Sequence, residues 1–423
     1  MFFLATVLFL VFHLAGLYFL FNEGRMLKNP LVKKQKYFAT GPQLFLMIVL
    51  ATGMFMLEPY STTRFSVWMV CMAFGVLTIE GRVKFTPALM SYMVYLFFLF
   101  FSLFYNAPDK EFGIRVIAKY SYPIFILMFA NKVGNSEFAV FSTVKFIFIA
   151  AIFVEISYLL WLPWIGLLWT GATLADHVVV MTTMAVALLF ITKKKKYLLL
   201  AAFFVIYPVV ATVRTGLIGL TASLSIFFIF KYKLKALPVV FVVAAAATMV
   251  VLYVPGVREK MFRKEMTAQE IIDNRDNLTM KDIDMNGRQA MWDWSLAKFY
   301  ENNKVFGTGV GNLQYVFYSG DHPFGKIRIV HNDYVQILAD TGLIGLILYL
   351  SIGLCMLIHS FFIYNDKRSN AAIKFCAIVA GATIIGIMAT SYTDNSVNYT
   401  MATYAYPYAF YGMALGLRQK YGM

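Results

Sequence analysis

Charged residues are scarce in this chain, and acidic residues are the scarcer kind. Only 14% of its 423 residues are Asp, Glu, Lys or Arg, and 22 acidic residues stand against 37 basic ones. Cysteine is rare too, because only Cys71, Cys355 and Cys376 are present, in apolar stretches without the spacing of a metal site. We therefore expect no disulfide framework, no zinc site and no water-soluble fold.

Hydrophobic residues, by contrast, make up 60% of the chain. Apolar stretches of roughly 20 residues recur from end to end, and a helix of this length crosses the hydrocarbon core of a bilayer. The sequence predicts an all-α fold, a polytopic integral membrane protein with about 12–13 transmembrane helices. Residues 1–21 lack a basic leading region and a small-residue cleavage site, so we interpret them as a retained first span.

The net charge of +15 would suggest a nucleic-acid partner in a soluble protein. Here the basic residues cluster in short gaps between apolar stretches, which is typical of cytoplasmic loops in membrane proteins. We therefore expect no nucleic-acid partner. The clearest of these gaps are "KKKK" at 193–196, "KYKLK" at 231–235 and "DKRSN" at 366–370.

The alternation of spans then puts the one long polar segment on the side of the membrane opposite to the basic gaps. We divide the chain into an N-terminal transmembrane bundle, residues 1–254, a loop with amphipathic helices, residues 255–330, and C-terminal transmembrane helices, residues 331–423. Polar residues at the outer ends of the spans are the candidates for a functional site.

Arg214 stands between apolar segments at the outer end of one predicted span. A charged side chain at the centre of a bilayer costs roughly 2.5 to 3.5 kcal/mol unless it reaches an interface or a partner. Arg214 is therefore a candidate functional residue. Glu155, Asp176 and His177 fall near the outer ends of neighbouring spans, and charge pairing with them is the alternative explanation.

The long polar segment contains a predicted helix that starts near Arg288, with Asn286 as its cap. The start of this helix also favours an anion, through free amides and the helix dipole. Gly307, Gly309 and Gly311 resemble a phosphate cradle but lack the strand and helix of a dinucleotide fold, so we interpret them as a flexible turn beside a site. The apolar side of the helix, typical of a helix on a membrane surface, consists of Met291, Trp292, Leu296, Phe299 and Tyr300.

The apolar stretch "VHNDYVQILADTGLIGLILYL" carries His331 and Asn332 at its start. On a helix, His331 would share a face with Tyr334, Gly342 and Gly345, and such glycines let another helix approach closely. We expect His331 to face the protein interior near the outer surface. The alternative is that Asn332 caps the helix and His331 is an interfacial residue with a backbone partner.

Arg214, Arg288 and His331 together suggest transfer chemistry on a lipid diphosphate. Each guanidinium presents a planar fork to phosphate oxygens and stays charged. An imidazole takes a proton from an attacking hydroxyl near neutral pH.

These segments resemble the bacterial O-antigen ligase and O-antigen polymerase superfamily, which are polytopic membrane glycosyltransferases with one large periplasmic loop. The resemblance covers the C-terminal half of the chain. It rests on His331 and Asn332 followed after nine residues by "GLIG", on "VRTG" at Arg214, and on "GRQAMWDW" and "FGTGVGNL" at 287–294 and 306–313.

The resemblance implies an enzyme of the bacterial inner membrane whose active site faces the periplasm. Its donor would be a glycan on undecaprenyl diphosphate, and its acceptor lipid A core or a second lipid-linked repeat. Arg214 and Arg288 would bind the diphosphate, and His331 would activate or orient the acceptor hydroxyl.

The resemblance also implies that neither a nucleotide sugar nor a metal is required, and we expect no cofactor. A predicted outer loop contains one DxD motif, "DID" at 282–284. We give this motif little weight, because acidic pairs are common in solvated loops. We include Asn332, Gly309 and Gly311 as further substrate-binding residues.

Three other functions compete with this one. Isolated intramembrane charges also occur in secondary transporters, but the sequence has no evident internal repeat and has a long polar loop. A peptidoglycan polymerase would use a similar lipid donor, with a catalytic acidic residue expected in a loop. A glycan-binding scaffold would not need two arginines for a diphosphate. Within the favoured superfamily the spacing of His331 and "GLIG" is closer to the ligase pattern, although the sequence alone leaves ligase and polymerase open.

Overall fold

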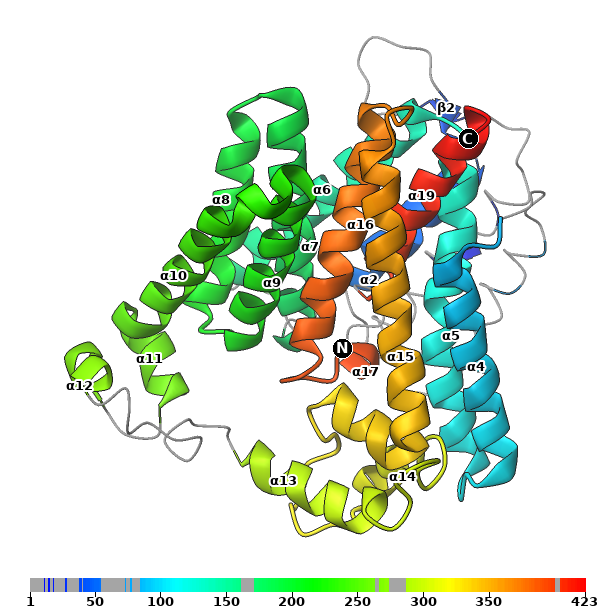
Figure 1. The fold of residues 1–423 in the computed structure, drawn as a ribbon, viewed down its shortest axis with the longest axis vertical. Coiled ribbons are helices and arrows are strands. Elements are labelled where there is room, and N and C mark those ends of the chain that lie inside the picture. Colours follow the sequence, from blue (N-terminus) through cyan, green and yellow to red (C-terminus); the bar gives the residue numbers. More distant parts are fainter. Residues whose placement is uncertain are drawn as a thin grey trace.

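The described part of the chain is an assembly of helices (Figure 1). In this computed structural model, strands β1 (Leu27–Lys28) and β2 (Phe38–Ala39) form one short antiparallel pair. Apart from a few residues among the first 80, the structure describes residues 41–54, 84–160, 171–262, 266–273, 287–399 and 404–423.

The helices fall into two groups. Helices of the bundle are α2 (Gly41–Met54), α4 (Pro87–Tyr105), α5 (Lys110–Val133), α6 (Glu137–Leu159), α7 (Gly171–Thr192), α8 (Lys196–Val210), α9 (Arg214–Tyr232), α10 (Leu237–Tyr253), α15 (Asp333–Asn365), α16 (Ala371–Thr390) and α19 (Tyr406–Lys420). Short helices are η2 (Lys233–Ala236), α11 (Pro255–Met261), α12 (Ala268–Asp273), α13 (Arg288–Ser295), the π-turn η4 (Leu296–Tyr300), α14 (Asn312–Ser319) and α17 (Ser396–Tyr399).

Several helix starts follow from polar residues that interrupt the apolar pattern. Thr86, Asp109, Ser136, Asn332 and Asn370 each precede a helix, and the side-chain oxygen of each accepts a hydrogen bond from the backbone N–H three residues later. Such a cap satisfies an amide that the first helical turn leaves open and contributes about 1 kcal/mol. The sequence thereby fixes where these helices begin.

Within the described residues, six helices are long and apolar enough to cross a membrane. Two shorter apolar helices, Asp176–Thr192 and Lys196–Val210, accompany them. The predicted all-α polytopic membrane fold is therefore confirmed. The predicted number of spans includes residues 1–21 and other stretches that lie outside the described residues, so that number stays a prediction.

The longest of the six, Arg214–Tyr253, consists of two helices joined by a turn. Lys233, which follows α9, has φ 53° and ψ −134°, and the 3-10 turn η2 leads from it into α10. The two helices run back along each other, because Arg214 at the start of α9 and Leu252 near the end of α10 line one groove. The break predicted at "KYKLK" is confirmed.

The basic gaps gather at one end of the bundle, which is the upper end in Figure 1. Arg418 pairs with Asp366 at 3.0 Å, which joins the C-terminal helix to the turn between α15 and α16. The rings of Phe230 and Tyr364 lie 5.9 Å apart between centroids, which brings the end of α9 to the same place. That this end faces the cytoplasm stays a prediction.

Helices α11 to α14 lie toward the opposite end of the bundle, with α13 and α14 at the bottom of Figure 1 and α11 and α12 at its lower left, beyond the end of α10. Part of this region has a hydrophobic core of its own, which it shares with the first turns of α15. The buried members of that core are Met291, Trp292, Phe299, Leu313, Val316, Phe317, Val330, Val335 and Ala339. The start of α15 is therefore held by protein on its outer side.

Gly342 interrupts α15 and makes room for a neighbouring segment. Its φ of 65° and ψ of −164° are not helical. The N–H of Leu343 consequently donates to the carbonyl of Lys304 at 2.8 Å instead of to its own helix. A Cβ on Gly342 would lie 2.4 Å from the carbonyl oxygen of Val305. The close approach expected at this glycine is real, but the approaching element is an irregular segment and not a helix.

Candidate functional site

His331 lies directly before helix α15 and not on it. Asn332 is the N-cap, and its Oδ1 accepts a hydrogen bond from the N–H of Val335 at 3.0 Å. The φ of His331 is 54°, in the left-handed region that non-glycine residues seldom occupy. The expectation that His331 shares a helical face with Tyr334 is therefore wrong, and the capping role of Asn332 is confirmed. Strained backbone of this kind concentrates at functional sites.

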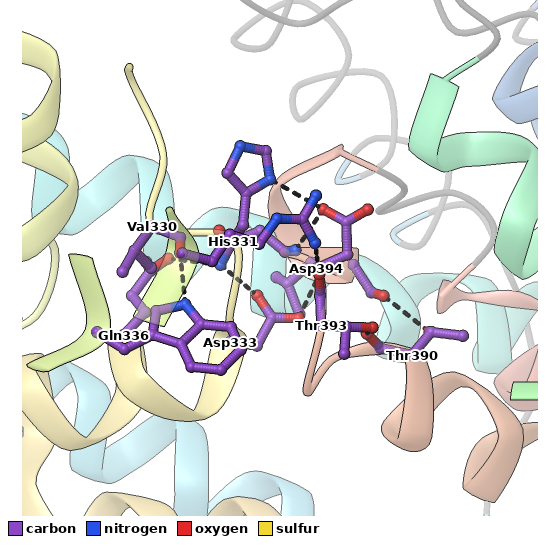
Figure 2. Close-up of polar contacts among 12 residues, drawn as sticks. Val330, His331, Asp333, Gln336, Thr390, Thr393 and Asp394 are labelled. Atoms are coloured by element: carbon purple, nitrogen blue, oxygen red, sulfur yellow. Dashed lines mark hydrogen bonds and ion pairs between the residues drawn. The ribbon is translucent and has the colours of Figure 1, made fainter. Parts of the chain in front are cut away.

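The imidazole of His331 faces the carboxylate of Asp394 (Figure 2). His331 Nδ1 lies 3.3 Å from Asp394 Oδ1, and the two side chains are 25% and 12% exposed. The pair is thus reachable from outside yet partly shielded from water. With its proton on Nδ1, the ring donates to Asp394, and Nε2 becomes its basic nitrogen. A histidine oriented by a carboxylate in this way is equipped to act as a general base.

Asp394 is fixed by a network around Asp333, the first residue of α15. We call residues 390–397 the anchor loop; it leads from the end of α16 into α17. Asn395 Nδ2 donates to Asp333 Oδ1 at 2.9 Å, and the N–H of Val397 donates to Oδ2 at 3.2 Å. Asp333 is only 1% exposed, so these bonds are shielded from water. They hold the anchor loop against the residues that carry the imidazole.

Helix α13 is tied to both chain segments of the site. Arg288 donates from a guanidinium nitrogen to the carbonyl of Thr393, the residue before Asp394. Trp292 Nε1 donates to the carbonyl of Val330, the residue before the histidine, at 2.9 Å. The structure therefore brings Arg288 and the imidazole to one place, although the sequence separates them by a long loop.

The surroundings of α13 differ from the prediction in two respects. Its N-cap is Gly287, with φ 72° and no side-chain hydrogen bond, whereas Asn286 lies outside the described residues, as does "DID" at 282–284. Its apolar side packs within the protein, with Met291 and Trp292 buried in the core shared with α14 and α15. Periodicity indicated the apolar side correctly, but it cannot tell a protein partner from a membrane surface.

Arg214 lies at one end of a groove between α9 and α10. Its guanidinium donates to the carbonyl of Lys260 in α11. The groove has a volume of about 810 Å³, and helices α11 and α12 contribute to its walls. Its lining beyond Arg214 is almost entirely apolar and includes Leu217, Ile218, Ala247, Val251, Met261 and Ile271. A cation at the end of an apolar groove suits a ligand with an anionic head and a hydrocarbon tail.

Arg214 is linked to the anchor loop through the packing of α9 on α16. A Cβ added to Gly219 would lie 2.4 Å from Cγ2 of Thr390, so the two helices touch there. Arg214 lies five residues before Gly219, which is about 7.5 Å nearer the start of the helix. The groove and the His331–Asp394 pair therefore open at the same end of the bundle.

The glycines of "FGTGVGNL" hold the chain close to its neighbours. The N–H of Gly309 donates to the carbonyl of Asp340 at 2.8 Å, and the N–H of Gly311 donates to its carboxylate at 3.0 Å. The N–H of Leu313 also donates to that carboxylate, at 2.8 Å. The amides that a phosphate would need are thus already bonded within the protein. The structure supports a packing role for Gly309 and Gly311 and not the predicted contact with substrate.

This packing predicts a large effect of a small substitution. A Cβ at Gly309 would lie 2.4 Å from the Cα of Ala107, and φ there is 110°. Gly309→Ala should lower the free energy of unfolding by about 2–4 kcal/mol, because both backbone strain and a clash with backbone are added. Gly320→Ala is the matched control: φ is 88°, but none of the described residues has an atom within 4 Å of its added Cβ. It should cost only about 1–2 kcal/mol.

The measurement is the thermal or denaturant midpoint of each purified variant in detergent. Equal midpoints for the two alanine variants would contradict the assignment of a packing role to Gly309.

Sequence reasoning did not find Asp394, and it gave no role to Asp333, which holds the anchor loop, or to Asp340, which holds the glycine turn. The polar run that follows the apolar stretch of α16 was the available signal for Asp394. It was not decisive, because polar runs end many spans. Asp340 stands out in the sequence as an acid inside an apolar stretch, but nothing there shows that it binds backbone amides.

The match to a known protein family covers this same region. Residues 208–350 match the family model described as O-antigen ligase. About a third of the chain is thus similar to this family. The predicted resemblance is thus confirmed. The matched region contains Arg214, Arg288 and His331, whereas the anchor loop with Asp394 follows it in the chain. No curated protein matches the chain.

Proposed function

We propose that this protein transfers a glycan from undecaprenyl diphosphate to an acceptor hydroxyl, and that the acceptor is lipid A core, as in an O-antigen ligase. The observation that carries the proposal is the His331–Asp394 pair within and beside the matched region. The reaction would take place at the periplasmic face of the inner membrane, the face opposite to the lysine-rich turns.

The reaction needs a base, and His331 is placed to be one. The acceptor oxygen attacks the anomeric carbon of the glycan, a new C–O bond forms, and the bond from that carbon to the diphosphate oxygen breaks. The hydroxyl proton passes to Nε2 of His331, while Nδ1–H stays bonded to Asp394 and the imidazolium is stabilised by the carboxylate. The electron pair of the broken bond leaves on undecaprenyl diphosphate, which can take the proton in turn.

The groove beside Arg214 supports a polyprenyl donor. Its apolar walls and its volume of about 810 Å³ suit a segment of isoprenoid chain. The guanidinium at its end would bind the diphosphate by charge-assisted hydrogen bonds. Arg288, near the reacting pair, would contact the same diphosphate or the leaving oxygen, where negative charge develops.

A polymerase of the same superfamily is the second candidate, since it uses the same donor with a second lipid-linked repeat as acceptor. The matched family does not distinguish the two, and our preference for the ligase rests on the spacing of His331 and "GLIG". A secondary transporter is a weaker candidate. The His331–Asp394 pair lies at a surface turn, where it can exchange a proton with a substrate. It does not itself form a path across the membrane.

The proposed function is tested by the lipopolysaccharide gel pattern of a strain that lacks the gene. A ligase predicts loss of all ladder bands, with polymer accumulating on undecaprenyl diphosphate. A single band of core plus one repeat would indicate the polymerase instead. An unchanged ladder, with no lipid-linked intermediate accumulating, would contradict both.

A further inference from the structure

The anchor loop carries the groups that orient the proposed base, so its own attachment decides the geometry of the site. Asp394 bonds the imidazole and Thr393 accepts from Arg288. The loop begins at Thr390, the last residue of helix α16, and Ser391 is the C-cap of that helix. Asp333 attaches the loop on the side of α15. A second attachment lies on the side of α7.

That second attachment is the buried carboxylate of Asp176. Thr390 donates from its hydroxyl to Asp176 Oδ1, across 214 positions in the sequence. Thr390 Oγ1 also lies 3.0 Å from Ser396 Oγ and 2.7 Å from the carbonyl oxygen of Ile387 in its own helix, so Asp176 and Ile387 share its one proton. Since Thr390 gives its proton to these acceptors, Ser396 can donate to Thr390 in turn. Thr390 is thereby bonded to a carboxylate in α7, and Ser396 is linked to that carboxylate through Thr390.

Burial makes this arrangement rigid. Asp176, Thr390 and Ser396 are 1%, 1% and 2% exposed. A hydrogen bond to a carboxylate is stronger than one between neutral groups, and in a buried position water does not compete for it. Breaking it would also leave a buried acceptor unsatisfied, which is costly. The loop therefore has little freedom to move Asp394 away from the imidazole.

We propose that Asp176 is a positioning residue for the reaction, acting through Thr390 on the orientation of Asp394 and His331. The inference rests on the proposed function. Asp176 lies in the "ADHVVV" segment, for which the sequence indicated no role beyond charge pairing with Arg214. The same bond also joins α7, α16 and the anchor loop at the end of the bundle where the groove of α9 opens.

The test uses two threonines of one helix. Thr390→Val keeps the shape and removes the hydroxyl that bonds Asp176. Thr383→Val is the matched control, because Thr383 is also buried in α16 and its hydroxyl bonds the carbonyl of Val379 in its own helix at 2.7 Å. With purified protein, Thr390→Val should lower kcat about tenfold or more while leaving donor affinity within about twofold, since misplaced reacting groups cost turnover. Thr383→Val should change neither by more than about twofold.

Two further variants separate positioning from general stability. Thr390→Ser restores the hydroxyl and should restore turnover, and Asp176→Ala should lose as much turnover as Thr390→Val. In a His331→Ala background, Thr390→Val should cost no further turnover, because the base that it positions is already absent.

Equal turnover of the Thr390→Val and Thr383→Val proteins would overturn the proposal, as would a full additional loss in the His331→Ala background. Failure of the wild-type protein to transfer any glycan would instead contradict the proposed function itself, so the two failures are distinguishable.

Discussion

His331→Ala should lower the turnover of glycan transfer by roughly 10²-fold or more while leaving donor binding largely intact. This is the usual loss when a general base is removed, and it should appear in kcat because the base acts only as the proton moves. The imidazole is bonded to Asp394 and lies apart from the apolar groove, so the donor keeps its contacts. Transfer of a labelled lipid-linked glycan and donor affinity would be measured separately in nanodiscs.

Two variants sharpen this prediction. His331→Gln keeps a hydrogen-bonding side chain but cannot take up a proton at neutral pH, so it should stay strongly impaired. His322→Ala is the control within the same outer region: the centroid of that ring lies 4.5 Å from that of Phe317, a buried residue of the core shared by α13, α14 and α15. It should lower turnover by no more than about threefold. A Gln variant with near wild-type turnover would reduce His331 to an orienting residue.

Arg214→Ala should weaken donor binding about 10- to 100-fold, because a charge-assisted contact to the diphosphate is lost at the end of the groove. Arg214→Lys should recover only part of this affinity. A lysine keeps the charge, but it lacks the planar fork that binds two phosphate oxygens and also reaches the carbonyl of Lys260. The measurement is displacement of a labelled polyprenyl diphosphate from the purified protein.

Lys260→Ala is the control for local charge. It removes a neighbouring positive charge but leaves the backbone carbonyl that Arg214 contacts. Affinity should then fall by less than about threefold. If Arg214→Ala and Lys260→Ala weakened binding equally, the role of Arg214 would be general electrostatic attraction and not recognition of the diphosphate.

The sequence allowed the spans and their ends to be predicted because both depend on local patterns. Apolar length and basic gaps indicated the break between α9 and α10 and the turn between α15 and α16. Asn332 was recognised as a possible cap from its position before an apolar stretch. In each case the residues that decide the structure are neighbours in the chain.

The parts that sequence reasoning missed depend on contacts between distant segments. Asp394 meets His331 only because α15 and α16 form a long hairpin that returns to its starting end. Asp176 meets Thr390 across 214 positions, about half of the chain. Gly309 and Gly311 were predicted to bind substrate as part of a flexible turn beside the site, whereas the carboxylate of Asp340 accepts hydrogen bonds from the amides of that turn. Periodicity and composition carry no information about such partners.

The central claim is that His331 takes the acceptor proton during transfer from a polyprenyl diphosphate. The most direct measurement is a single-turnover transfer reaction with purified protein, a labelled glycan on undecaprenyl diphosphate and lipid A core as acceptor. The account predicts a labelled glycan on the lipid A core with the wild-type protein, and with His331→Ala a protein that binds the donor but forms product at least about 10²-fold more slowly. Equal rates of product formation by the two proteins would contradict it.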